Sequence, residues 1–134
     1  MLLLPALPVR AAEKLWGALI FASNVEKPAE PPSELTPYLG KLSKIFGYNQ
    51  FSIVAEESEK IGRADREWEL NSKFITVKVE PLSVDAGTYE LALTMLREEQ
   101  VLLEMKSRVG IGSPLLIRGP MCGGGQLIIL LEVR

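Results

Sequence analysis

Apolar residues change their spacing along the chain, and each spacing predicts a different element. The run LWGALIFAS, from Leu15 to Ser23, is almost entirely apolar and lacks a polar face. A short run of large side chains is typical of a buried strand, so we expect a central strand here. The next segment, KPAEPPSE (Lys27–Glu34), holds three prolines that disfavour helix and strand pairing, and it predicts a linker or a crossover connection.

A helical spacing follows this linker and predicts one amphipathic helix. Ser33 is placed to cap the helix, Pro37 lies in its first turn, where amides lack an acceptor within the helix, and Gly47 ends it. The apolar positions at three- and four-residue spacing are Leu35, Tyr38, Leu39, Leu42, Ile45 and Phe46. We expect this helix to pack on a β-sheet.

A period of two predicts strands beyond the helix. Phe51, Ile53 and Ala55 occupy alternate positions of a first strand, and EESEKIGRAD, residues 56–65, then reads as an exposed loop. Residues 68–79 alternate on both sides of Asn71-Ser72, which predicts a hairpin.

The segment Thr88–Val109 supports two interpretations. Its content of Leu, Glu, Met and Lys favours a long helix by propensity alone. Alternate residues from Tyr89 to Met95 are apolar, however, and the alternation resumes at Leu103 after a polar turn at 97–100. We therefore prefer two strands here, beyond a turn at 85–87.

Two apolar strands close the chain. They span Pro114–Arg118 and Gln126–Val133, and the glycine-rich loop GPMCGGGQ, residues 119–126, separates them. The elements together predict an α+β fold, with one main amphipathic helix packed on a mostly antiparallel β-sheet or small sandwich.

Length and charge restrict the classes of function. The 134 residues suit a single domain, which we place at 13–134. A net charge of −2 with scattered basic residues argues against a nucleic-acid partner. The chain has no histidine, so it lacks the commonest general base, histidine-dependent triads and histidine zinc ligands. The sequence contains no run of about 20 uninterrupted apolar residues, so it does not predict a membrane span.

The first residues resemble a secretory leader. Residues 1–12 contain a short leucine-rich run followed by Val9-Arg10-Ala11, which suits cleavage beside a small residue. A basic start is missing, so we read 1–12 as a truncated signal peptide and expect a periplasmic or secreted protein. The alternative is a hydrophobic tail that packs on the domain.

Glycine patterns give no cofactor site. Gly119 and Gly123–Gly125 suggest a phosphate cradle, but a phosphate-binding loop needs a Lys-Ser/Thr pair before a helix, whereas Gln126 leads into a strand. Gly110-Ile111-Gly112 lacks the third glycine of a dinucleotide fingerprint and reads as a turn.

Other chemically capable residues also have structural interpretations. Cys122 has no histidine partner and no visible cationic neighbour, and in an oxidising compartment it could pair between chains. Acidic residues could supply paired carboxylates or calcium ligands but lack the regular spacing of a calcium loop. They are Glu56, Glu57, Glu59, Glu98 and Glu99. Trp16, Trp68 and Tyr89 are expected in the core or on a sheet face. We therefore assign no catalytic, cofactor-binding or metal residue.

Two stretches carry a family resemblance. Residues 109–133, VGIGSPLLIRGPMCGGGQLIILLEV, and 39–54, LGKLSKIFGYNQFSIV, resemble small uncharacterised exported bacterial proteins with a helix-strand unit and a C-terminal β-meander. The former stretch is more loosely similar to the closing strands of secretin domains, whose other parts this chain lacks. The resemblance implies export and a β-rich end, and it assigns no catalytic residue.

These observations favour a non-enzymatic envelope protein. We expect a protein-interaction or secretion-accessory module that binds another envelope protein through an exposed sheet edge. The alternatives are a small hydrolase that uses loop carboxylates and a cytosolic structural domain. The sequence does not specify an oligomeric state.

Overall fold

The described residues form two four-stranded antiparallel sheets and one helical segment. The computed structural model describes residues 14–60, 67–85 and 87–134. Sheet A has the order β2-β1-β8-β7, and sheet B has the order β3-β4-β5-β6. The strands of sheet A are β1 (Lys14–Ser23), β2 (Gln50–Lys60), β7 (Leu115–Cys122) and β8 (Gly125–Val133). Those of sheet B are β3 (Trp68–Asn71), β4 (Thr76–Asp85), β5 (Thr88–Arg97) and β6 (Gln100–Gly110). The predicted α+β class is confirmed.

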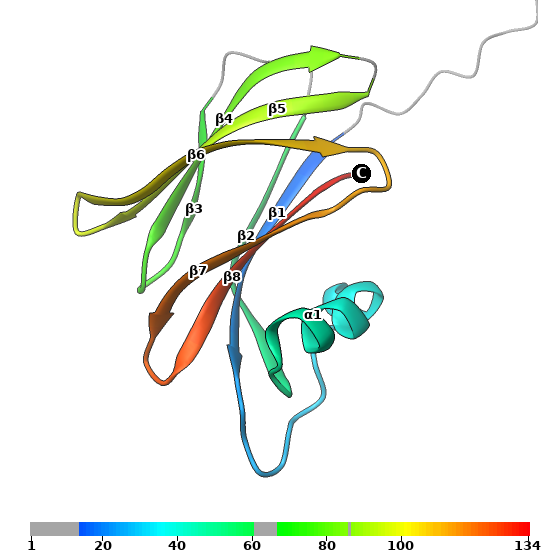
Figure 1. Ribbon diagram of the computed structural model, residues 1–134, viewed down its shortest axis with the longest axis vertical. Coiled ribbons are helices and arrows are strands. Elements are labelled where there is room, and N and C mark those ends of the chain that lie inside the picture. Colours follow the sequence, from blue (N-terminus) through cyan, green and yellow to red (C-terminus); the bar gives the residue numbers. More distant parts are fainter. Residues whose placement is uncertain (1–13, 61–66, 86) are drawn as a thin grey trace, which may run out of the picture.

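Sheet A lies between the helical segment and sheet B (Figure 1). Its central strands β1 and β8 are buried on both faces, which explains why their sequences are apolar at consecutive positions. Leu19 and Ile129 contribute to the core shared with sheet B, whereas Ile20 and Ile128 pack towards the helical segment. The expectation of a central strand at Leu15–Ser23 is confirmed.

The predicted helix forms as two shorter pieces. A 3₁₀-helix, η1 (Ser33–Tyr38), contains Pro37 and continues into α1 (Leu39–Phe46). The expected Ser33 cap is wrong, because Pro32 occupies the N-cap position and no side chain caps η1. Gly47 ends α1 in the left-handed conformation, as predicted.

One face of the helical segment packs on sheet A. Leu35, Tyr38 and Leu42 are buried there, and the ring of Tyr38 stacks on Trp16 of β1 with 6.4 Å between centroids. Ile45 is 55% exposed, so its predicted place on the buried face is wrong. The helix ends one residue beyond Ile45, and its packed face does not extend to that side chain.

Residues 88–109 form a hairpin, which confirms the preferred interpretation over a long helix. Tyr89 lies opposite Val109 and Leu93 lies opposite Met105 in the β5–β6 register. The inward residues of β5 complete the core between the sheets, and propensity is overridden because their alternation matches a half-buried sheet. Trp16, Trp68 and Tyr89 are buried, as expected.

Strand β2 is longer than predicted, and this corrects the expected loop at 56–65. Residues 56–60 continue the ladder with β1, where Glu59 lies opposite Leu15, while 61–65 lie outside the described residues. An irregularity beside Leu19 leaves Val54 as an extra residue. Phe51 therefore packs towards the helix and Ala55 towards sheet B, so their predicted common face is also wrong.

The expected eight-residue glycine loop is shorter in the structure. Strand β7 runs on to Cys122 and β8 starts at Gly125, so only Gly123 and Gly124 form the turn. Their φ angles are 53° and 81°, which suit a tight two-residue hairpin turn. Strands β7 and β8 extend up to Cys122 and from Gly125 because the two glycines between them permit this tight turn.

Candidate protein-interaction edge

Strand β6 forms one edge of sheet B and carries an exposed apolar segment. Within the described residues its ladder partner is β5, apart from one bridge between Gly110 and Ser113. Val101, Leu102 and Leu103 are 49%, 38% and 40% exposed near the start of the strand. The hairpin that holds them projects beyond the rest of the molecule (Figure 1). This combination of unpaired backbone and apolar side chains favours pairing with another chain.

The other sheet edges carry features that discourage such pairing. The second half of β2 holds Glu56, Glu57 and Glu59, and the β7 ladder is irregular around Pro120. Strand β3 has four residues, and within the described ranges the second half of β4 has no partner on that side, where Pro81 and a register shift interrupt regular pairing. Charges, proline and bulges are common protections of edge strands. Strand β6 also has a register shift, which leaves Leu102 as an extra residue, but its ladder with β5 is regular from Leu103 to Gly110. Among the described edges this is the longest regular run, and the exposed apolar residues Val101–Leu103 lie at its start.

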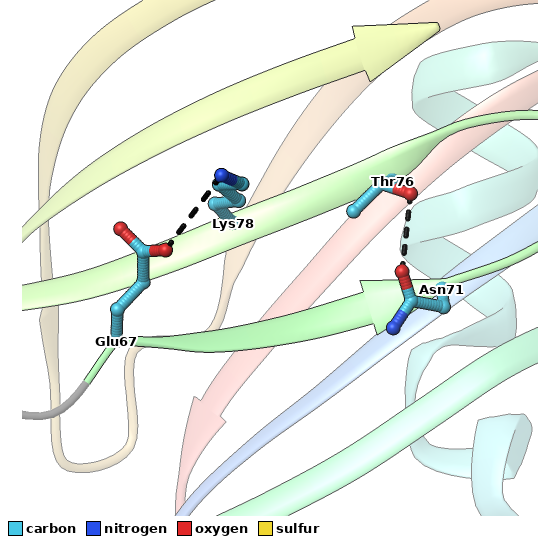
Figure 2. A network of polar contacts seen from close by, with 4 residues as sticks. All are labelled: Glu67, Asn71, Thr76 and Lys78. Carbon is cyan, nitrogen blue, oxygen red and sulfur yellow. Dashed lines mark hydrogen bonds and ion pairs between the residues drawn. The ribbon is translucent and has the colours of Figure 1, made fainter. Parts of the chain in front are cut away.

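The outer face of sheet B is polar. Lys78 of β4 lies 3.9 Å from the carboxylate of Glu67, and Thr76 donates a hydrogen bond to Asn71 at 3.1 Å (Figure 2). These contacts join β4 to β3 and the residue preceding it. This part of the face is suited to water. Outside β6, the exposed large apolar residues in the described part of sheet B are Leu82 and Val84, next to the register shift of β4.

Three hairpin turns surround a groove of about 480 Å³ next to this edge. We call it the turn groove; it is lined by segments 72–76, 96–98 and 121–123. Lys73 lies over the ring of Phe74, 5.1 Å from its centroid, and Phe74 stacks on Phe21. The turn groove thus combines an aromatic wall with basic side chains.

Cys122 lies in the turn groove and has a cationic neighbour that the sequence did not reveal. The Nη2 atom of Arg97 donates to its Sγ atom over 3.0 Å. Arg97 is 25 residues away in sequence, and the two side chains meet because the β5–β6 and β7–β8 hairpins turn at the same end of the molecule. The expectation of no cationic neighbour is therefore wrong.

Of the candidate carboxylates, Glu56 and Glu98 do not form a pair. Glu98 lines the turn groove, as does Cys122 at the β7–β8 turn. This turn lies near the Ala22 end of β1, because Gln126 at the start of β8 is opposite Ala22. Glu56 lies opposite Ala18, further back along β1, and its Oε2 atom accepts a hydrogen bond from Nε1 of Trp16 at 3.1 Å. The two acidic groups thus lie in different places, and Glu56 has a structural partner.

A buried polar network close to the β7–β8 turn was missed by sequence reasoning. Gln126 is buried, and its Oε1 atom accepts hydrogen bonds from Arg118 at 3.0 Å and from Tyr48 at 3.4 Å. Its amide nitrogen donates to the carbonyl of Gly119 in the irregular part of β7. Arg118 also lies over the ring of Phe46 at 4.9 Å. The network ties α1 to sheet A, and a polar residue at the start of an apolar strand was its only sequence signal.

Comparisons with family models, curated proteins and solved structures find no match for this chain. The resemblance of residues 109–133 to exported bacterial proteins therefore stays a prediction. The predicted leader, residues 1–12, lies outside the described residues. In the described ranges, no helix is long and apolar enough to cross a membrane, and no group of three or more Cys, Asp or Glu side chains is arranged to hold a metal ion.

Proposed function

We propose that this protein is a non-enzymatic envelope module, periplasmic or secreted, that binds a protein partner by strand addition at β6. The observation that carries the proposal is the apolar exposure of Val101–Leu103 on an unpaired edge strand. In strand addition, main-chain hydrogen bonds give affinity and alternate side chains give specificity. Strand β6 offers both, because its outward backbone groups lack a ladder partner in the described chain.

The edge can be tested by photo-cross-linking in the cells that make the protein. A photoreactive phenylalanine analogue at Val101 should give a covalent adduct with a discrete protein, because a strand added to β6 would lie against this position. Ile45 provides a matched control: it is an apolar residue of similar exposure that lies on α1 and not on a sheet edge. If Val101 and Ile45 gave the same adducts, or none, the proposed use of β6 would be wrong.

Export is tested separately. The leader-like pattern of residues 1–12 leads us to expect that the native protein lacks them. Intact-mass measurement of protein purified from its own cells should show a chain shortened near Ala11 or Ala12. A native chain that begins at Met1 would contradict leader cleavage, whatever the cross-linking shows.

A further inference from the structure

The charges on the outer face of β6 differ in whether the chain itself pairs them. Arg108 lies opposite Glu90 on β5 and forms an ion pair with it at 3.8 Å. Glu104 lies opposite Thr94 and Lys106 lies opposite Ala92, so neither meets an opposite charge across the ladder. Both are exposed, and in the described structure neither forms an ion pair. Strand β6 therefore presents one unpaired negative and one unpaired positive charge, two residues apart.

This spacing is self-complementary. If two copies of β6 run antiparallel about a twofold axis at Met105, Glu104 of each copy lies opposite Lys106 of the other. Two opposite-charge pairs then form from one patch, as a twofold interface requires. Cross-strand pairs of opposite charge stabilise a sheet, whereas like charges directly opposite destabilise it.

Neighbouring registers are less favourable. A shift that centres the axis on Glu104 places this residue opposite its own copy, and a shift to Lys106 does the same for the lysine. Each shift therefore creates a like-charge pair. A shift by one residue would turn inward-facing side chains outward, so it is disfavoured as well. The axis at Met105 alone, among these registers, gives only opposite-charge pairs at the two positions.

The inner face of β6 suits the same arrangement. Leu103 and Met105 point towards the core side, opposite the inward residues Met95 and Leu93 of β5. Leu103 is 40% exposed and Met105 is only partly buried. In the paired strands the two Met105 side chains would meet at the axis, where the flexible thioether adapts to a neighbour. The pairing would thus cover apolar surface that the single chain leaves in water.

We propose that the partner at β6 is a second copy of this chain, joined antiparallel about Met105 into one continuous eight-stranded sheet. The proposal rests on the proposed use of the β6 edge and names its occupant. Analytical ultracentrifugation of the full chain over a concentration series should show association to twice the monomer mass of 14.8 kDa. High salt should weaken this association, because the charge pairs are exposed.

Charge reversal tests the register. Either Glu104→Lys or Lys106→Glu turns both opposite-charge pairs into like-charge pairs, and each should raise the dissociation constant roughly tenfold or more. The double variant E104K/K106E restores opposite pairs and should dimerise like the unmodified chain. An equimolar mixture of the two single variants should form a heterodimer, which also shows that both single variants are folded.

Glu80→Lys is the matched control, because Glu80 is an exposed residue of β4 in the same sheet and lies away from the β6 edge. It should leave association unchanged. A dimer that is insensitive to both single reversals, or a mixture that fails to associate, would overturn the proposed pairing. A monomer whose Val101 cross-links to a different protein would also overturn it while the edge function stands. A monomer without any Val101 adduct would remove both proposals.

Discussion

At the scale of single residues, two hairpin turns both hold their two central residues at positive φ, but one turn uses glycines and the other uses glutamates. Gly123 and Gly124 have φ angles of 53° and 81°, and Glu98 and Glu99 have φ angles of 49° and 67°. Glycine adopts these angles freely, whereas a side chain makes them unfavourable by about 1 kcal/mol or more per residue. The glutamate turn is therefore strained, and the glycine turn is not.

Replacement of the strained residues should stabilise the protein. The double variant E98N/E99G supplies the Asn-Gly pair that suits positive φ at both positions of a two-residue turn. We expect the free energy of unfolding to rise by about 1 kcal/mol, measured as a higher midpoint in urea. Gly124→Glu is the reciprocal control: no atom lies within 4 Å of an added Cβ there, so backbone strain alone should lower the midpoint. An unchanged midpoint in both variants would contradict this account.

At the scale of elements, local patterns predicted those structures whose cause is local. Alternation at Tyr89, Leu91 and Leu93 identified β5 against helical propensity, and the apolar run at Leu15–Ser23 identified β1. Both patterns record burial on one or two faces, so they can be read from the sequence without knowledge of the neighbours. The same holds for the stop of α1 at Gly47.

Elements with non-local causes were predicted incorrectly. Glu56–Lys60 has the composition of a loop, yet it forms a strand because Lys14–Ala18 of β1 provides a ladder partner. Its charges are tolerated because β2 lies at a sheet edge. Pairing partners and bulges such as the one at Val54 depend on tertiary context, which alternation alone does not contain.

The candidate site was predictable only in general form. The sequence indicated an exposed sheet edge, but Val101–Leu103 could be assigned to that edge only once β6 was known to be the last strand of sheet B. Arg97 and Cys122 likewise meet through strand order and not through sequence spacing. Strand order follows from the packing of the whole molecule, so the site follows from it as well.

At the scale of the whole molecule, the described residues form three layers with two cores, one on each face of sheet A. Trp16 lies in the core beneath the helical segment, where the Arg134 guanidinium stands 3.8 Å from its ring centroid. Trp68 lies in the core between the sheets, so close to Gly17 that a Cβ there would come within 2.8 Å of its ring. Strands β1 and β8 contribute residues to both cores. Loss of one core would leave these strands half exposed, so we expect both cores to unfold together.

This coupling gives a prediction for Leu42, which is fully buried in α1. Leu42→Ala should lower the free energy of unfolding by about 2–5 kcal/mol, because it leaves a cavity against sheet A. The change should appear equally at both tryptophans, although Trp68 belongs to the other core. In W16F and W68F backgrounds, fluorescence would follow one remaining tryptophan at a time during urea unfolding, and its midpoint should coincide with that of far-ultraviolet circular dichroism. Ile45→Ala on the exposed side of the same helix should change stability by less than about 0.5 kcal/mol. If Leu42→Ala shifted the Trp16 transition and left that of Trp68 in place, the helical layer would unfold independently, and residues 13–134 would not be one cooperative domain.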